Sequence, residues 1–215
     1  MISSHRNCSF RVSTFAFATL VVLELFASPA QARRNKEPVI FARSAEDPVL
    51  RHRVATLAPG VDPEEARLVV STAYTTGREL ARKWRVLWPP GLQNFLVNTG
   101  ARKGGLCFQW AAELLSRLDG LQLKTLELHW AESYPGTASE HNVIVVTARG
   151  QPFFQGILFD NWRYCGRLAW GPINGDPEYE WKENPAELTS RLARSRSESG
   201  HRPKTAAKSS SNTGL

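Results

Sequence analysis

The stretch HNVIVVTARGQPFFQGILFDN, residues 141–161, decides the fold of this chain. Two apolar runs, residues 142–148 and 153–159, flank the turn sequence 149–152, as in an antiparallel hairpin. Regular pairing across this short loop places His141 directly opposite Asp160, with both side chains on one face. A bulge at Gly156 would slip the register by one residue and move them to opposite faces.

Two helices are predicted upstream of this hairpin. The first begins at Asp62-Pro63, a capping residue followed by a proline, and extends to about Trp88. Its apolar residues recur at helical spacing, which is typical of a helix packed on a core. The second covers about residues 106–118 and follows Gly104-Gly105.

The remaining segments complete an α+β prediction. Residues 121–130 are predicted to form a further strand, and residues 161–187 a long irregular segment that its tryptophans pack against the sheet. Helices followed by strands predict one α+β domain over residues 62–188, preceded by a lead-in at residues 33–61.

The N-terminal segment, residues 1–32, has the pattern of a secretory signal peptide. Arg6 and Arg11 precede an apolar run, and Ala30-Gln31-Ala32 offers a cleavage site. The run is shorter than the ~20 residues that span a bilayer, and Glu24 interrupts it. We therefore predict export across the inner membrane, with a periplasmic location and a substrate outside the cytoplasm.

The positive charge of the chain is concentrated at its C-terminus. The net charge is +7, and residues 189–215 contain six Lys or Arg residues against the single acid Glu198. The nearly neutral body gives no support for nucleic-acid binding. The polar tail is predicted to be disordered, and it could make a weak electrostatic contact with an acidic surface.

Cys107 is the candidate nucleophile. It lies at the predicted start of a helix, where free backbone amides and the helix dipole stabilise a thiolate. The small residues Gly104 and Gly105 before it leave room for an approaching carbonyl, and nearby backbone amides could hold an oxyanion. A buried structural cysteine is the plainer alternative.

His141 is the best candidate for the base. His52 lies in the lead-in and His201 in the tail, whereas His129 lies within a predicted strand and is explained by packing. His141 directly precedes the most apolar strand, at an edge of the sheet where active-site residues are common. Asp160 opposite it would orient the imidazole and stabilise its charged form.

In this order and spacing the residues resemble the bacterial transglutaminase-like cysteine proteinases, a branch of the papain-like cysteine enzymes. The resemblance covers about residues 63–170 and rests on three short motifs: Gly105-Leu106-Cys107, His141-Asn142-Val143 and Phe159-Asp160-Asn161. It implies a papain-like fold and attack of Cys107 on an amide carbonyl, which forms a thioester acyl-enzyme. It also implies that Asn161 supports the site.

One feature of the family pattern is missing. Papain places a glutamine of its oxyanion hole shortly before the nucleophile, and Ala101 occupies that position here. Gln93, Asn94 or Asn98 could take this role, together with the backbone at Gly105. Trp162 and Trp170 are candidates for lining a substrate cleft. No cofactor or metal ion is predicted.

Three functions remain open on the sequence alone. The first is hydrolysis of a peptide or isopeptide bond in a protein or peptide substrate. The second is a transglutaminase reaction, in which an amine takes the acyl group in place of water. The third is a binding module in which a disulfide joins Cys107 to Cys165, since oxidising compartments permit such bonds.

Overall fold

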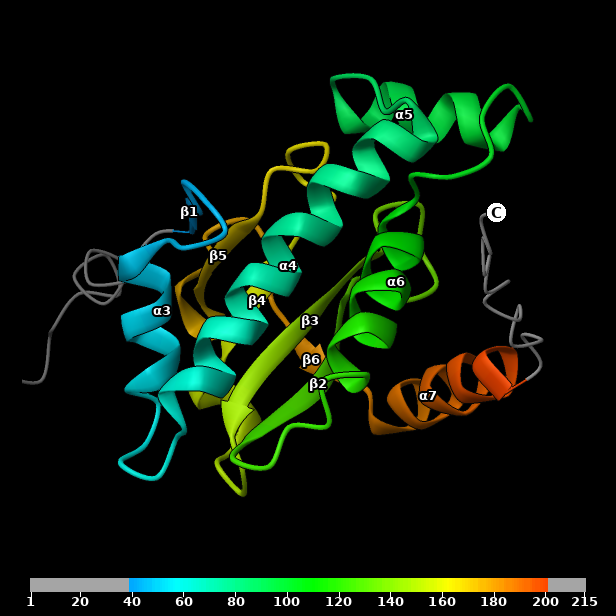
Figure 1. Ribbon diagram of the computed structural model, residues 1–215. Helices are drawn as coiled ribbons and strands as arrows, with labels where there is room; N and C mark the ends of the chain where they lie inside the picture. The colour runs from blue at the N-terminus through cyan, green and yellow to red at the C-terminus, as the bar shows by residue number, and fades with distance from the viewer. Residues whose placement is uncertain (1–38, 201–215) are drawn as a thin grey trace, which may run out of the picture. The chain divides into compact units, whose positions relative to one another are not determined.

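One antiparallel sheet of six strands organises the part of the chain that the computed structural model describes, residues 39–200. The strand order is β1-β5-β4-β3-β2-β6. The strands are β1 (Ile40–Phe41), β2 (Leu126–Ser133), β3 (His141–Ala148), β4 (Ile157–Asp160), β5 (Ala169–Pro172) and β6 (Lys182–Glu183). The long pair β2 and β3 lies near the middle of the sheet (Figure 1).

Five helices accompany the sheet within these residues, so the α+β class is confirmed. They are α3 (Pro48–Ala55), α4 (Pro63–Trp84), α5 (Pro90–Asn98), α6 (Cys107–Asp119) and α7 (Pro185–Gly200). Within residues 39–200, no helix is long and apolar enough to cross a membrane.

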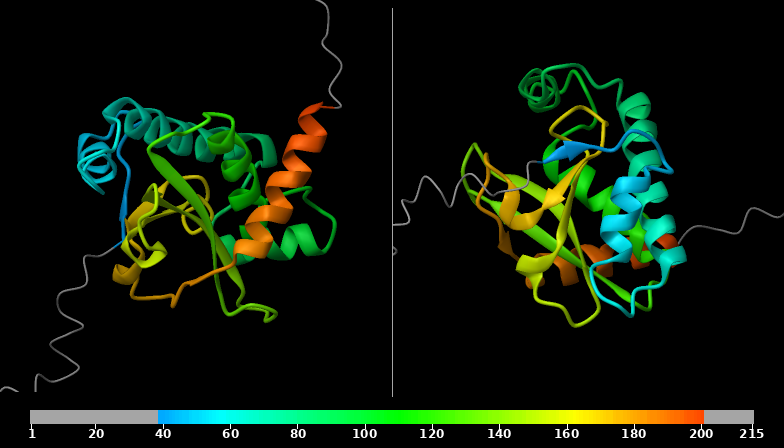
Figure 2. Two further views of the ribbon diagram at one scale, coloured as in Figure 1. Left: turned by 90° about the horizontal axis from the view of Figure 1, so that it is seen from below. Right: turned by 90° about the vertical axis from the view of Figure 1, so that its left-hand side faces the viewer.

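The main core lies between the sheet and the helices α3, α4 and α6 (Figures 1 and 2). Alternate residues of β3, such as Ile144 and Val146, face these helices, as the period of a strand requires. The residues between them, Val143 and Val145, enter a smaller core on the opposite face with Trp181. Both faces of β3 are therefore buried, in agreement with its continuous apolar sequence.

The predicted helices are confirmed, with one difference in length. Asp62 caps α4 by accepting a hydrogen bond from the Glu64 amide at 2.9 Å. This helix ends at Trp84 and not at Trp88, because Arg85 takes a left-handed conformation with φ of 52°. The sequence analysis did not predict α5, which begins at Pro90 with Pro89 as its N-cap residue.

The strand predicted at residues 121–130 begins later, at Leu126. The carboxylate of Glu65, in the first turn of α4, accepts hydrogen bonds from the amides of Lys124 and Thr125 at 2.6 and 2.8 Å. These bonds fasten the segment before β2 to the helix, so pairing with β3 starts only at Leu126, opposite Ala148.

The predicted register of the central hairpin is wrong by two residues. Residues 153–155 form a 3-10 helix, which lengthens the connection and delays the start of β4 to Ile157. Val145 consequently lies opposite Leu158, and continuation of this register places Asp160 opposite Val143. Because strand side chains alternate with period 2, this shift keeps Asp160 on the same face as His141.

The structure adds detail at one end of the domain and corrects a prediction at the other. The predicted lead-in, residues 33–61, contains α3, whose Leu50 and Val54 are fully buried in the main core. The C-terminal tail is helical up to Gly200 and not disordered there. The predicted signal peptide and residues 201–215 lie outside the described residues.

The helix α7 is held against the body by specific contacts. Arg196 donates to the Asp119 carboxylate at 2.8 Å, and Ser195 shares a hydrogen bond of 2.6 Å with Ser116. Leu192 packs on the main core, and Figure 2 shows α7 beside α6. The positive charges of residues 189–198 therefore belong partly to folding contacts, which the composition of the tail did not reveal.

Candidate active site

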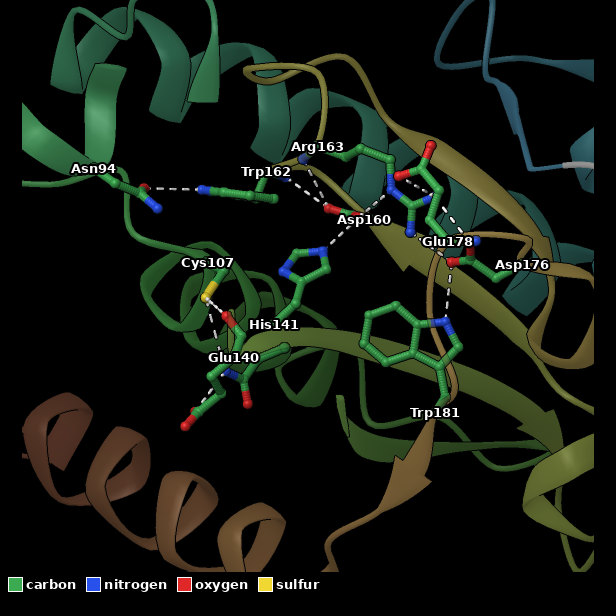
Figure 3. A network of polar contacts seen from close by, with 11 residues as sticks. Asn94, Cys107, Glu140, His141, Asp160, Trp162, Arg163, Asp176, Glu178 and Trp181 are labelled. Atoms are coloured by element: carbon green, nitrogen blue, oxygen red, sulfur yellow. Dashed lines mark hydrogen bonds and ion pairs between the residues drawn. The ribbon is translucent and has the colours of Figure 1, made fainter. Parts of the chain in front are cut away.

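Cys107 is the first residue of α6, and its side chain is 9% exposed. Its sulfur lies 3.5 Å from the carbonyl oxygen of Glu140 and 3.8 Å from the side-chain nitrogen of Asn142. Both residues belong to the start of β3 and the loop before it. The helix terminus and this strand end therefore bring Cys107 beside His141, as Figure 3 shows.

The two glycines before Cys107 are explained by packing. A Cβ atom at Gly104 would lie 2.5 Å from the Trp84 ring, and one at Gly105 would lie 2.7 Å from the Gln93 side chain. Gly105 also has a φ of +121°, which side chains other than glycine rarely adopt. The glycines thus let the chain pass between the Trp84 ring and the buried Gln93 side chain on its way to Cys107.

The imidazole of His141 is buried and oriented by Asp160. Its Nε2 atom lies 2.8 Å from Oδ2 of Asp160, and both side chains are 1% exposed. Its Nδ1 atom is also buried and has no hydrogen-bond partner among the described residues. In Figure 3 this nitrogen faces the side of the ring where Cys107 lies. One nitrogen is therefore anchored, and the other is available to the thiol.

Asp160 has all the partners that a buried carboxylate requires. Its Oδ1 atom accepts from the amides of Trp162 and Arg163 at 2.9 and 3.0 Å, and its Oδ2 atom accepts from the Arg163 side chain at 3.0 Å. Burial opposes its ionisation, but His141 and Arg163 outweigh burial and lower the pKa of Asp160 to about 2. It is thus an anion across the ordinary pH range.

The same contacts determine the charge of His141. Burial disfavours the imidazolium, but the Asp160 carboxylate, with a smaller contribution from Cys107, raises the pKa of His141 to about 9. At neutral pH the ring therefore carries a proton on each nitrogen. Positively charged neighbours of this kind favour the thiolate form of a cysteine.

Arg163 and Asp176 form the layer behind the Asp160 carboxylate, and the sequence analysis did not identify them. Arg163 donates to both oxygens of Asp176, at 3.2 and 2.5 Å, and Trp181 donates to Asp176 at 3.0 Å. Both charged residues are buried. Arg163 is close to Asp160 in sequence, but no pattern in the irregular segment pointed to Asp176.

Asn142 is a third residue to which the sequence analysis gave no role in the site. Its Oδ1 atom accepts from the indole of Trp130 at 2.9 Å, which directs the amide nitrogen to Cys107 and to the Glu140 carboxylate at 3.0 Å. The period of the strand contained a signal for this position. His141 and Asn142 point to opposite faces, so Asn142 must face the helix layer that holds Cys107.

Three aromatic rings surround the imidazole. The ring centroids of Trp162, Tyr179 and Trp181 lie 4.5, 4.8 and 5.3 Å from that of His141. A cavity of about 390 Å³ opens beside His141. Its lining includes Trp162, Tyr179 and Tyr134, so the prediction that Trp162 lines a cleft agrees with its place here.

Trp170 does not line this cavity. It is 3% exposed and packs in the main core on β5, paired with Ile40 of β1. The prediction that it contributes to a cleft is therefore wrong, because β5 turns this side chain towards the helices.

Asn161 does not contact the three predicted catalytic side chains. Its amide nitrogen donates to the carbonyl of Ala73 at 3.2 Å, and a Cβ atom at Gly77 would lie 2.5 Å from its Oδ1. Asn161 thus fastens the end of β4 to α4. Any support that it gives the site acts through the backbone of the neighbouring Asp160.

The residues proposed for the oxyanion hole have different positions. Gln93 is buried near Gly105, but its amide donates to the Gly104 carbonyl at 2.7 Å and accepts from Leu87. Asn94 lines the cavity and accepts from the Trp162 indole at 3.2 Å, whereas Asn98 is exposed at the end of α5. The amide of Gly105 donates to the Gln109 side chain at 2.9 Å. The side-chain amide of Gln93 and the backbone N–H of Gly105 therefore already have hydrogen-bond partners within the chain.

Cys107 and Cys165 are both free thiols, so the disulfide considered above is not formed in this structure. The Cys165 thiol donates a hydrogen bond to the carbonyl oxygen of Leu87 at 3.3 Å, and burial raises its pKa.

His129 is packed, as expected, between Glu183 and Thr147. Among residues 39–200, no group of three His, Cys, Asp or Glu side chains is arranged to hold a metal ion.

Comparisons of the chain with protein-family models, with curated proteins and with solved structures found no match. The chemistry of the site therefore has to be argued from its own geometry.

Proposed function

We propose that this chain is an exported, thiol-dependent amide hydrolase with a papain-like, transglutaminase-like fold. The observation that carries the proposal is the arrangement of His141. Its Nε2 atom is hydrogen-bonded to the buried Asp160, and its buried Nδ1 atom has no hydrogen-bond partner among the described residues and faces the side where Cys107 lies. A nucleophile, a base and an orienting carboxylate in this order are the parts of a catalytic triad. Export rests on the pattern of residues 1–32 alone.

The proposed reaction begins with a thiolate of Cys107 and an imidazolium of His141. The sulfur attacks the carbonyl carbon of the amide, and the resulting tetrahedral intermediate collapses as His141 gives its Nδ1 proton to the leaving amine. Water then attacks the thioester carbonyl as His141 removes a proton from it, and the C–S bond breaks to release the acid and regenerate the Cys107 thiolate. Asp160 keeps its charge throughout and stabilises the imidazolium.

The amide N–H of Cys107 is the proposed donor to the oxyanion. It lies in the first turn of α6, where backbone N–H groups have no partner within the helix. The helix dipole adds to the stabilisation of negative charge at this point. The Asn142 side-chain nitrogen, 3.8 Å from the sulfur, is a further N–H group directed at the thiolate.

The state of Cys107 is tested by alkylation of the full chain with iodoacetamide across pH, with mass spectrometry to assign the modified cysteine. We expect fast alkylation of Cys107 at neutral pH, because the positively charged imidazole of His141 favours a thiolate beside it. Cys165 provides an internal comparison, since burial raises its pKa. Alkylation of Cys107 only at alkaline pH would contradict the proposed thiolate.

The reaction itself is tested by the release of amines from a peptide library. Cys107→Ala should abolish this activity, and Cys165→Ala should retain it. Full activity of Cys107→Ala on every substrate that the unmodified chain cleaves would refute the proposal. Addition of a primary amine then distinguishes hydrolysis from acyl transfer, because only the transfer product contains the added amine.

A further inference from the structure

A second hollow lies at the edge of the sheet that β1 forms, and Cys107 does not line it. It has a volume of about 280 Å³ and is lined by Phe41, Ala42, Arg43, Tyr74, Arg78 and Arg167. These residues come from β1 and the chain after it, from α4, and from the segment before β5. Figure 1 shows β1 at the edge of the sheet, beside β5. None of them lines the cavity beside His141.

Close backbone contacts bring two of the three arginines together. A Cβ atom at Gly77 would lie 2.7 Å from the carbonyl oxygen of Gly166, and one at Gly166 would lie 2.6 Å from that of Gly77. The helix α4 and the segment before β5 therefore touch at two glycines. Arg78 and Arg167 directly follow these two glycines, so the contact holds their backbone positions close together.

The third arginine is held by hydrogen bonds of the backbone. The amide of Ala42 donates to the carbonyl of Leu168 at 2.9 Å. The amide of Arg43, the next residue, donates to the buried carboxylate of Asp47 at 2.7 Å. Arg43 thus continues from a strand that is paired beside Arg167, and all three guanidinium groups are carried by ordered backbone.

The charge of this hollow is not compensated. Its lining contains no Asp or Glu, and within residues 39–200 none of the three guanidinium groups forms an ion pair. The Arg167 group instead lies over the Phe41 ring at 4.3 Å. Other surface arginines, such as Arg117 and Arg196, do pair with a carboxylate. Three like charges around one hollow repel each other unless an anion joins them.

We propose that this hollow binds a doubly charged phosphate group, either free phosphate or a phosphate monoester. Guanidinium groups match phosphate oxygens through paired N–H donors, and three of them favour a dianion over a single carboxylate. The volume leaves room for part of the group that carries the phosphate, and the rings of Phe41 and Tyr74 provide a surface for it. This binding is independent of the amide hydrolysis proposed above.

The test is calorimetric titration of the full chain with inorganic phosphate at constant ionic strength, in the presence of sodium chloride. Binding of one phosphate is expected, and Arg78→Gln and Arg167→Gln should each weaken it about tenfold. Arg82→Gln is the matched control, since Arg82 lies on α4 but does not line the hollow. No binding, or an equal loss in Arg82→Gln, would overturn the proposal.

A second measurement identifies the carrier of the phosphate. Sedimentation with vesicles that contain phosphatidic acid is compared with vesicles of phosphatidylcholine, and glycerol phosphate is titrated in parallel. Vesicle binding that Arg167→Gln removes and Arg82→Gln retains supports a lipid carrier, and binding of glycerol phosphate alone supports a soluble one. Binding that is the same for both vesicle types, with no response to either soluble phosphate, contradicts the site. The rate of Cys107 alkylation should be unchanged in all variants.

Discussion

His129 and His141 lie on neighbouring strands of one sheet, both buried, and each is bonded to an acidic side chain. His129 lies opposite Val145, so the two rings are on the same face. Glu183 and Thr147 occupy both nitrogens of His129, at 2.6 and 2.8 Å. In His141 only Nε2 is bonded, and Nδ1 remains open beside Cys107. Burial and a carboxylate are thus common to both, and the open nitrogen beside a thiol distinguishes the candidate base.

The largest difference between the two histidines is expected in the reactivity of Cys107. His141→Ala should slow its alkylation at pH 6 by about 100-fold or more, in the range of general acid–base contributions. His129→Ala should leave the rate nearly unchanged, because its ring bonds to Glu183 and Thr147 only. Quenched time courses of alkylation, analysed by mass spectrometry, measure the rate in both variants. Equal rates would show that the two histidines do not differ in their effect on Cys107.

The acidic partners of the two histidines, Asp160 for His141 and Glu183 for His129, should differ in their importance for stability. The network of Asp160 is tested through Arg163, which bonds to it. Arg163→Met leaves Asp160 and Asp176 buried without their shared cation, which should lower the free energy of unfolding by about 3–5 kcal/mol.

The matched change at the other histidine is Glu183→Gln. Its side chain is 34% exposed, and the expected loss is about 1 kcal/mol. Urea denaturation measures both variants. Similar losses would show that the Arg163 network is solvated and not buried as described.

The pH dependence of stability should also depend on His141. Its pKa in the folded chain is raised to about 9, so its stabilisation is complete below the unfolded value of about 6.5 and is lost as the pH rises towards 9. The lowered pKa of Asp160 acts in the opposite direction, and its contribution is lost as the pH falls from about 4 to about 2.

Urea denaturation between pH 2 and pH 10 tests both contributions. His141→Gln should remove the decline on the alkaline side, and His129→Gln should retain it. An alkaline decline of the same size in His141→Gln would assign it to another group.

The smallest expected effect concerns the amide beside the sulfur. Asn142→Ala removes the N–H group 3.8 Å from Cys107 and leaves the Trp130 indole without its acceptor. The long contact supports a reduction of about threefold to tenfold in the alkylation rate at pH 6, in the range of a weak hydrogen bond. A shift of the whole pH profile would indicate a contact with the thiolate, whereas a loss of stability alone would indicate a packing role.

The central elements could be predicted because their signals are local. Asp62-Pro63 predicts the start of α4, because the first residue caps a helix and the second favours its first position. The continuous apolar run of β3 predicts a strand that is buried on both faces. The sequence analysis paired His141 with Asp160 through a register that is wrong by two residues. The two side chains still lie on the same face of the sheet, because strand side chains alternate with period 2. The 3-10 helix that caused the shift has no distinct signal in residues 153–155.

The sequence by itself determined the α+β class, the order of the main helices and strands, and the choice of Cys107, His141 and Asp160 as a group. Periodicity, capping residues and helix ends are properties of neighbouring residues, so they can be derived without the fold. Only the tertiary structure decided that Asn161 and Trp170 lie outside the site and that α7 is ordered. The tertiary structure also brought Arg163 to Asp176, because contacts between distant segments depend on packing and on lengths of connections that no local pattern encodes.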